Sequence, residues 1–229
     1  MKIAGFTPLS LVDYPGQVCA VLFTQGCNLR CPFCHNARLI PTDENPRTLI
    51  SWETIRNRLI ARNDMVSAVV VSGGEPTLQS ELIEMLRELR SLKFRIKLDT
   101  NGTRPEKLEA IIREELVDYV ALDLKAPFDE RMHEAAGRGN VTESIQKSLS
   151  ILSQASIAYE VRTTCHNGVD AIALKHMAFA LPADASWFIQ KCNSHFQYES
   201  LPRTSKWAYD QVRELRAITH KVKLRGWNV

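Results

Sequence analysis

Residues 18–34 read VCAVLFTQGCNLRCPFC, and the fold and chemistry of the chain can be argued outward from them. The first part of this segment is almost entirely apolar, which is typical of a strand that is buried on both faces of a parallel sheet. Three cysteines follow, Cys27, Cys31 and Cys34, in the spacing C-x₃-C-x₂-C. A buried strand that leads directly into a cysteine loop predicts a chemical site at the carboxyl end of that strand.

The spacing of these three thiols suits one iron–sulfur cluster. Three thiolates on a [4Fe–4S] cube leave one iron without a protein ligand, where a substrate or cofactor can bind, whereas electron-transfer ferredoxin sites fill that position with a fourth cysteine. A structural zinc site would need a fourth ligand, for which His35 is the candidate, and the sequence contains no second cysteine pair. The spacing therefore favours a three-cysteine cluster over zinc.

Composition describes an ordinary globular protein. The 229 residues are 45% hydrophobic and 24% charged, and the net charge of +3 gives no argument for a nucleic-acid partner. The sequence has no run of 18 apolar residues and no signal-peptide pattern, so we expect no membrane span and no secretion. Six cysteines in that context indicate a reducing cytoplasm and a metal site. We expect Cys19, Cys165 and Cys192 to be buried thiols in strands.

Strand-like runs alternate with helix-like segments along the chain. Strands are predicted at 18–24, 66–72, 94–98, 119–122, 158–164 and 187–190. Helices are predicted at 51–62, 80–92, 105–115, 141–154, 170–180 and 204–220. Residues 1–16 are expected to form a mostly polar lead-in. The alternation predicts an α/β fold with parallel strands, in which six βα units are too few to close an eight-stranded barrel.

Domain organisation follows from the same pattern. The sequence shows no long linker or low-complexity tract, so residues 1–229 are expected to form a single domain. Its core is expected at residues 16–200, and its closing helix at residues 204–220.

Motifs that contain glycine, acidic or lysine residues follow several of the predicted strands. They are Gly73-Gly74-Glu75-Pro76, Asp99-Thr100-Asn101-Gly102 and Asp123-Leu124-Lys125, and Arg162 lies in the fifth predicted strand. Paired glycines let a ligand approach the main chain closely, and a lysine supplies a point charge for a carboxylate. Because the carboxyl ends of parallel strands lie at one edge of a sheet, these motifs are expected to converge on one site with the cysteine loop.

The cysteine motif, with Phe33 before its last thiol, resembles that of the radical S-adenosylmethionine (SAM) enzymes. The runs LVDYPG at 11–16 and QGCNLRCPFCHN at 25–36 are similar to the anaerobic ribonucleoside-triphosphate reductase activating proteins. More broadly they resemble the glycyl-radical-enzyme activases, such as pyruvate formate-lyase activating enzyme. This resemblance implies a partial (β/α)₆ radical SAM barrel that holds a [4Fe–4S] cluster on Cys27, Cys31 and Cys34. It also implies that S-adenosyl-L-methionine binds the open iron.

The resemblance also implies which residues contact the cofactor. They are Phe33, Cys34, His35, Asn36, Gly73, Gly74, Glu75, Thr100, Asn101, Asp123, Lys125 and Arg162. Phe33 packs near the adenine in family members, and the main chain at residues 34–36 meets the adenine edge. The Gly-Gly-Glu motif receives the ammonium group, and Lys125 and Arg162 reach the carboxylate.

The resemblance leaves several site positions open. Asp99, Thr100 and Asp123 are candidates for a monovalent cation site. Asp99 and Asp123 equally suit pairing with lysines or capping of the following helices.

Other residues also have a plain structural alternative. Phe33 suits simple packing at the base of the loop, and Arg162 suits an ion pair on the face of the sheet. Activases often present a histidine near the end of the sixth strand, where Asn193 or His195 is the candidate here. The pairs Cys165-His166 and Cys192-x₂-His195 are interpreted as loop residues, because a second metal would lack ligands.

An activase is the leading functional hypothesis. The resemblance implies that a 5′-deoxyadenosyl radical abstracts hydrogen from a glycine of a partner, for which anaerobic ribonucleoside-triphosphate reductase is the candidate. A flavodoxin or ferredoxin-type protein would supply the electron. The first alternative is a radical SAM enzyme that modifies a small molecule or nucleotide. The second is a non-catalytic iron–sulfur electron carrier.

Overall fold

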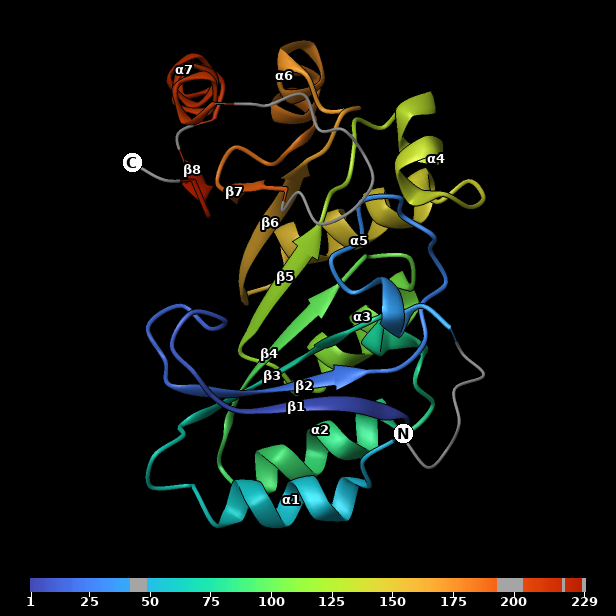
Figure 1. Cartoon of the computed structure of the whole chain (residues 1–229), viewed down its shortest axis with the longest axis vertical. Coiled ribbons are helices and arrows are strands. Elements are labelled where there is room, and N and C mark those ends of the chain that lie inside the picture. Colours follow the sequence, from blue (N-terminus) through green and yellow to red (C-terminus); the bar gives the residue numbers. More distant parts are fainter. Residues whose placement is uncertain (42–48, 193–203, 220, 228–229) are drawn as a thin grey trace.

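A computed structural model describes residues 1–41, 49–192, 204–219 and 221–227, and one curved sheet organises them (Figure 1). The strands are β1 (Ile3–Ser10), β2 (Cys19–Thr24), β3 (Ala68–Gly73), β4 (Arg95–Thr100), β5 (Tyr119–Asp123), β6 (Ala158–Cys165), β7 (Ser186–Lys191) and β8 (Val222–Arg225). They lie in the sheet in sequence order. All neighbours from β2 to β8 pair in parallel, and β1 pairs with β2 in the antiparallel direction. The sheet is therefore an open partial barrel with β1 and β8 as its edges.

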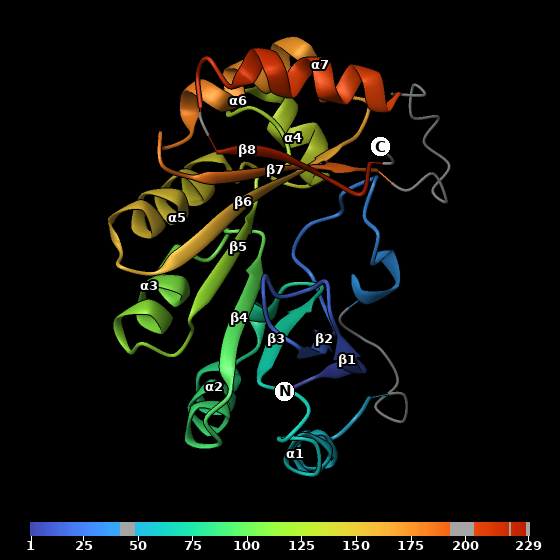
Figure 2. The same cartoon turned by 90° about the vertical axis from the view of Figure 1, so that its left-hand side faces the viewer.

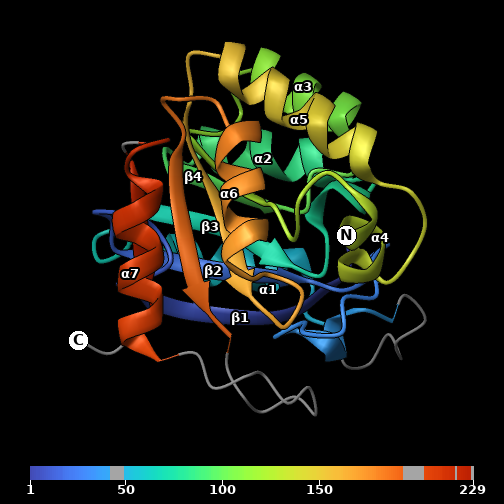
Figure 3. The same cartoon turned by 90° about the horizontal axis from the view of Figure 1, so that it is seen from above.

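Helices connect the parallel strands. They are α1 (Trp52–Ile60), α2 (Leu82–Ser91), α3 (Pro105–Arg113), α4 (Glu130–Ala136), α5 (Thr142–Gln154), α6 (Ala171–Ala180) and α7 (Ser205–Leu215). Two short 3₁₀ turns, η1 (Ala37–Leu39) and η3 (Pro76–Leu78), lie in the loops after β2 and β3. Figure 2 shows that the sheet curves from β1 to β8 with α1, α2, α3, α5, α6 and α7 outside the curve. Seen from above, α6 lies in front of the strands, and α3 and α5 lie on the opposite side of the picture from β1 (Figure 3).

Side-chain caps fix where several helices begin. The Ser51 hydroxyl accepts from the N–H of Thr54 at 3.2 Å at the start of α1. Asp170 accepts from the N–H of Ala173 at 2.7 Å at the start of α6. Such caps contribute about 1 kcal/mol each, because they satisfy an N–H that the first helical turn leaves without a partner.

The two faces of the sheet differ in polarity. The outer face packs against the helices in the main core, to which α2 contributes the fully buried Leu82, Leu86 and Leu89. The inner face carries only a small apolar cluster of Tyr14, Cys19, Val21, Ala68 and Val70. The rest of the inner face is available for polar side chains near the carboxyl ends of the strands.

The six predicted parallel strands and six predicted helices are confirmed to within a few residues. The expectation for residues 1–16 is wrong, because Ile3–Ser10 forms an edge strand that pairs with β2. Helix α4 was not predicted, and the closing helix ends at Leu215 and is followed by β8. These elements are short or lie at the edge of the sheet, where hydrophobic periodicity is weakest. No helix among the described residues is long and apolar enough to cross a membrane.

Candidate functional site

A cavity of about 310 Å³ lies at the carboxyl end of the sheet, inside the curve. Every candidate site residue that the sequence singled out, among those that the structure describes, lines this cavity. They are Cys27, Cys31, Phe33, Cys34, His35, Asn36, Gly73, Gly74, Glu75, Asp99, Thr100, Asn101, Asp123, Lys125 and Arg162. The predicted convergence of the strand-end motifs on one site is therefore a feature of the structure. Asn193 and His195 lie outside the described residues.

The cysteine loop is held from three directions by the main chain. The N–H of Gly26 donates to the carbonyl of Leu39 at 2.7 Å, which closes the base of the loop. The N–H of Glu75 donates to the carbonyl of Gly26 at 2.8 Å, which ties the loop to the end of β3. The N–H of Arg30 donates to the carbonyl of Ala136 at 2.8 Å, so the end of α4 supports the stretch between two of the thiols.

Gly73 and Gly74 let the protein's own main chain approach closely. A Cβ at Gly73 would lie 2.2 Å from the main-chain nitrogen of Thr24, and the φ of Gly73 is +125°. A Cβ at Gly74 would lie 2.2 Å from the carbonyl oxygen of Gly26. Only glycine fits both positions, since any side chain would push the cysteine loop away from β3. The two glycines therefore position the cysteine loop, in addition to lining the cavity.

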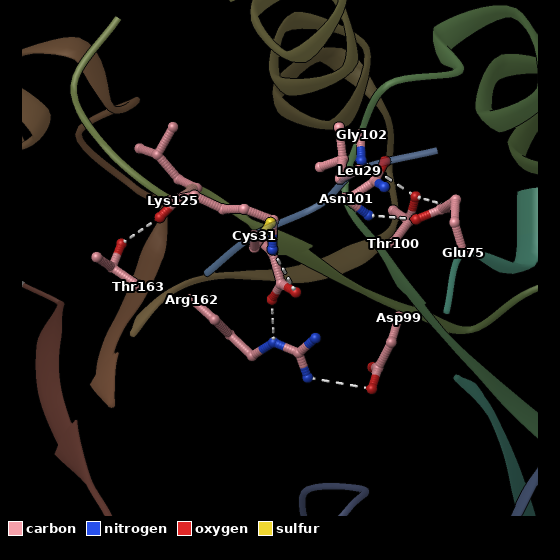
Figure 4. Close-up of polar contacts among 12 residues, drawn as sticks. Leu29, Cys31, Glu75, Asp99, Thr100, Asn101, Gly102, Lys125, Arg162 and Thr163 are labelled. Carbon is pink, nitrogen blue, oxygen red and sulfur yellow. Dashed lines mark hydrogen bonds and ion pairs between the residues drawn. The ribbon is translucent and has the colours of Figure 1, made fainter. Parts of the chain in front are cut away.

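Glu75 joins the end of β3 to the end of β4. Its side chain is 1% exposed. Oε1 accepts from the N–H of Thr77 at 3.1 Å. Oε1 also accepts from the hydroxyl of Thr100 at 2.8 Å, and Oε2 accepts from the N–H of Asn101 at 2.7 Å (Figure 4). The hydroxyl of Thr77 also donates to Oε1 at 2.5 Å. Burial raises the pKa of Glu75 above its usual value, although these hydrogen bonds act to lower it.

A charged network crosses the inner face below the thiols. Arg162 bridges two carboxylates, with Nη1 at 3.1 Å from Asp99 and Nε at 2.8 Å from Asp123 (Figure 4). Lys97, which is 2% exposed, lies 2.6 Å from Asp99. Lys125 lies 3.5 Å from Asp123. We call these five side chains the inner-face charge network; with two carboxylates and three cations, its formal charge is +1.

The network fixes the ionisation of its members. Burial acts to raise the pKa of Asp99, but Arg162 and Lys97 lower it to about 2. Burial acts to lower the pKa of Lys125, but the Asp123 carboxylate and the neighbouring thiols raise it above its usual value. The surplus positive charge therefore persists at neutral pH, beside the cysteines, and can receive an anionic group.

The donor set fits an iron–sulfur cluster. Three thiols line one cavity, and burial raises the pKa of Cys27 to about 11 and also raises that of Cys31. Partly buried thiols of this kind ionise when a metal centre supplies the positive charge. Lys125 adds a fixed cation next to them, which further favours thiolates.

The zinc alternative receives no support from the geometry. Within the described ranges, no three Cys, His, Asp or Glu side chains gather around a point where one metal ion would lie. A structural zinc ion needs four ligands in a tetrahedron about 2.0–2.3 Å from the metal. An iron–sulfur cube is a larger body whose irons each take one cysteine, so its thiols need not meet at a point.

Some residues of the site are not evident from the sequence. His166 lies in the loop after β6, as the sequence predicts, and its ring stacks on Phe33 at a centroid distance of 3.9 Å, which the sequence did not indicate. Asp13, Thr164 and Gln190 also line the cavity. Thr164 and Gln190 alternate with buried residues along β6 and β7, so their side chains lie on the inner face of the sheet. This alternation could have identified them from the sequence once it was known which residues of each strand face inward. Cys192 was expected in a strand, and it lies just beyond β7 and is half-buried.

Comparison with known proteins identifies the family. The Radical SAM superfamily model matches residues 21–180. The chain is 37% identical over 166 residues to a candidate glycyl-radical enzyme activating enzyme of Methanocaldococcus jannaschii, a match that covers 71% of this chain and 67% of that protein. It is 31% identical over 146 residues to the pyruvate formate-lyase 1-activating enzyme of Escherichia coli, which covers 61% of this chain and 58% of that protein. The chain therefore belongs to the radical SAM superfamily, and within it to the glycyl-radical enzyme activating enzymes.

A solved structure shares the fold. SuiB of Streptococcus suis, bound to its precursor peptide SuiA, matches with a TM-score of 0.71 and 15% identity, covering 90% of this chain and 48% of that one. At that identity the match shows the fold alone. Enzymes of this superfamily use a [4Fe–4S] cluster and S-adenosylmethionine, and the three cavity-lining cysteines of this chain fit that cluster.

Proposed function

We propose that this chain is an activase that generates a glycyl radical on a partner enzyme. One observation carries the proposal: three thiols and a network with surplus positive charge line a single cavity in a chain of the glycyl-radical enzyme activating family. The thiols suit a cluster, and the charge suits the carboxylate of SAM. When bound, the reduced cluster and SAM supply a 5′-deoxyadenosyl radical as the hydrogen-abstracting agent.

The chain's own residues bind and orient the cofactor. Cys27, Cys31 and Cys34 hold the cluster, and Lys125, which is largely buried and lines the same cavity, receives the methionine carboxylate. Phe33 is 7% exposed at the cavity wall and offers a flat apolar face for the adenine. These contacts are individually ordinary; holding them in a fixed arrangement is what makes a radical transfer efficient.

Arg162, Glu75 and the candidate cation ligands take more specific places in the proposal. Arg162 acts on the SAM carboxylate through the positive charge of the network, because its guanidinium group already forms ion pairs with Asp99 and Asp123. Glu75 acts indirectly, by holding Thr100 and the loop after β4 in place. A monovalent cation on Asp99, Thr100 and Asp123 stays a prediction, and such an ion would have to share these groups with their present protein partners.

The partner and the surroundings follow from the same family membership. We take anaerobic ribonucleoside-triphosphate reductase as the glycyl-radical enzyme, because the sequence around the cysteines resembles its activating proteins. A flavodoxin or ferredoxin-type protein is the proposed reductant, and a reducing cytoplasm suits three free thiols. Nucleic acid and membrane play no part in this proposal.

The first experiment tests the cluster. Anaerobic reconstitution should give about four irons per chain, held by three thiolates. Replacing Cys27, Cys31 or Cys34 by Ala should abolish iron binding, whereas replacing Cys19 or Cys165, both buried in strands away from the cavity wall, should leave it intact. Retention of zinc in place of iron after anaerobic purification would contradict the proposal.

The second experiment tests radical transfer. Reduced protein, SAM and a candidate reductase are mixed anaerobically, and electron paramagnetic resonance should detect a glycine-centred doublet that requires every component. Cleavage of SAM without such a doublet on any glycyl-radical enzyme would favour the small-molecule alternative. An intact cluster that does not bind SAM would favour the electron-carrier alternative.

A further inference from the structure

His166 is the first residue after β6 and makes two contacts that span the site. Its imidazole stacks on the ring of Phe33, with centroids 3.9 Å apart and planes inclined by only 5°. Its Nε2 lies 2.8 Å from the carbonyl oxygen of Lys125. One side chain therefore contacts the cysteine loop on one side and the segment after β5 on the other.

The hydrogen-bond partners of His166 define its protonation. Nδ1 accepts from the main-chain N–H of Gly168 at 3.1 Å, so this nitrogen carries no proton. The carbonyl of Lys125 can only accept, so Nε2 must carry the proton and donate it. These two hydrogen bonds fit a neutral imidazole with its proton on Nε2.

The bond to Lys125 continues a row that fixes the main chain after β5. The N–H of Leu124 donates to the carbonyl of Arg162 at 2.9 Å. The hydroxyl of Thr163 then donates to the carbonyl of Leu124 at 2.9 Å, and His166 binds the next carbonyl, that of Lys125. This row determines where the Lys125 side chain leaves the main chain, because two successive carbonyls are held by β6 and the residue that follows it.

The turn after β6 leaves the imidazole little freedom. The N–H of His166 donates to the carbonyl of Thr164 at 2.9 Å, and the N–H of Val169 donates to the carbonyl of His166 at 3.0 Å. A Cβ at Gly168 would lie 3.0 Å from Cε1 of the ring, tighter than ordinary van der Waals contact. Gly168 therefore provides both the hydrogen bond and the space that the ring needs.

We propose that His166 is a positioning residue for SAM, which holds the Phe33 ring and the Lys125 main chain in a fixed relation across the cavity. The inference rests on the proposed function, in which Phe33 faces the adenine and Lys125 the carboxylate. A ring and a cation that are already in place lose less conformational freedom when the cofactor binds, so preorganisation appears as affinity. His166 itself need not touch the cofactor for this effect.

The test separates the two contacts with three variants. His166→Phe keeps the stack but removes the hydrogen bonds, His166→Gln keeps a donor for the Lys125 carbonyl but removes the stack, and His166→Ala removes both. The dissociation constant of SAM is measured by equilibrium dialysis on anaerobically reconstituted protein with an oxidised cluster. We expect it to rise roughly fivefold for Phe and for Gln, and at least as much for Ala, because one side chain makes both contacts and their effects need not add.

Two further measurements distinguish positioning from general stability. Iron content per chain should stay at the wild-type value in all three variants. The change that SAM causes in the electron paramagnetic resonance spectrum of the reduced cluster should become smaller in His166→Ala, which loss of stability alone would not produce. Gly168→Ala, which crowds the ring without altering His166, should weaken SAM binding in the same direction. His176→Gln serves as the matched control, because His176 is exposed on α6 and bonds Arg131 outside the cavity.

The outcomes separate this inference from the function on which it rests. Wild-type SAM affinity in either His166→Phe or His166→Gln would overturn the double-contact role. Loss of the cluster from His166→Phe, which keeps the stack, would overturn it too, because His166 would then support the cluster loop itself. If the wild-type protein with an intact cluster fails to bind SAM, the proposed function fails instead.

Discussion

Glu75, which is buried, and Asp99, which is largely buried, follow or lie in neighbouring strands, and their surroundings shift their pKa values in opposite directions. Neutral donors surround Glu75, namely two main-chain N–H groups and two threonine hydroxyls, and burial raises its pKa. Asp99 instead faces the cations of Lys97 and Arg162, and its pKa falls to about 2. Burial alone therefore does not decide the direction in which the pKa of a carboxylate shifts in this site, since the charge of its partners also contributes.

The two carboxylates also serve different purposes. Glu75 connects loops: it holds the end of β3 to the residues after β4, and its own N–H binds the cysteine loop. Asp99 forms ion pairs with Arg162 and Lys97 and so holds both cations on the inner face, where the net positive charge of the network faces the cavity. We expect damage at Glu75 to act through geometry and damage at Asp99 or Arg162 to act through electrostatics.

The largest effect is expected from Arg162→Met. This change leaves the Asp99 and Asp123 carboxylates without their shared cation. Breaking a buried pair from one side typically costs about 3–5 kcal/mol, and the low end applies here because Asp99 keeps Lys97, Asp123 keeps Lys125, and the Asp123 side chain is 33% exposed. Urea unfolding at neutral pH measures it. The matched control is Arg87→Met, whose partner Glu114 is on the surface; such exposed pairs contribute about 0–1 kcal/mol. Equal losses in the two variants would mean that the inner-face charge network does not behave as a buried one.

A smaller loss is expected from Glu75→Gln. The amide of Gln must face the N–H of either Thr77 or Asn101, so a buried donor meets a donor, which costs about 1–3 kcal/mol. Urea unfolding measures the loss, and SAM affinity should fall with it because the loop after β4 shifts. Glu106→Gln on the exposed face of α3 is the control and should change neither quantity. Full stability in Glu75→Gln would show that Glu75 does not tie the strands together.

The pH dependence of stability sharpens the contrast. The pKa of Asp99 is lowered from 3.8 to about 2, so its contribution is present above pH 3.8 and is lost as the pH falls toward 2. That loss amounts to about 2 kcal/mol, which Asp99→Asn should remove. The pKa of Glu75 is raised above 4.5, so its contribution is present below pH 4.5 and is lost as the pH rises through the folded value.

Unfolding free energies of both variants, measured across this pH range, check the two signs. Relative to the wild type, Asp99→Asn should flatten the acid side of the curve, and Glu75→Gln should flatten the side above pH 4.5. The same sign of change in both variants would contradict the opposite shifts in pKa.

The smallest effect is expected from exchanging monovalent cations. Asp99 and Asp123 are bonded to Arg162, the Thr100 hydroxyl donates to Glu75, and the charge network is already positive. The melting temperature of the protein without SAM should therefore be the same in potassium and in tetramethylammonium salts of equal ionic strength. A potassium-specific rise in the melting temperature would show that an ion shares these groups even before SAM binds.

Much of the fold was predictable because the parallel strands have a clear signal in the sequence. The runs at β2 and β3 are continuous and apolar, as strands buried on both faces must be, and glycine or acidic motifs mark their ends. Strand β1 was missed because its burial is mostly intermediate, so its sequence lacks a clear hydrophobic pattern. Helix α4 is too short for a periodic signal, yet its end supports the cysteine loop.

The sequence by itself determined the chemistry of the site: a three-cysteine loop, a lysine and two acidic motifs, each placed after a strand whose direction sends it to the same edge. The type of each side chain and the end of the strand that it follows can both be read from a short stretch of sequence. Only the tertiary structure decided the partners. It showed that Glu75 holds the loops after β3 and β4 together, that Arg162 joins two carboxylates, and that His166 stacks on Phe33 from a distant part of the chain. Those pairings join residues 25 or more positions apart, so they depend on the curvature of the sheet and on packing, which no local pattern encodes.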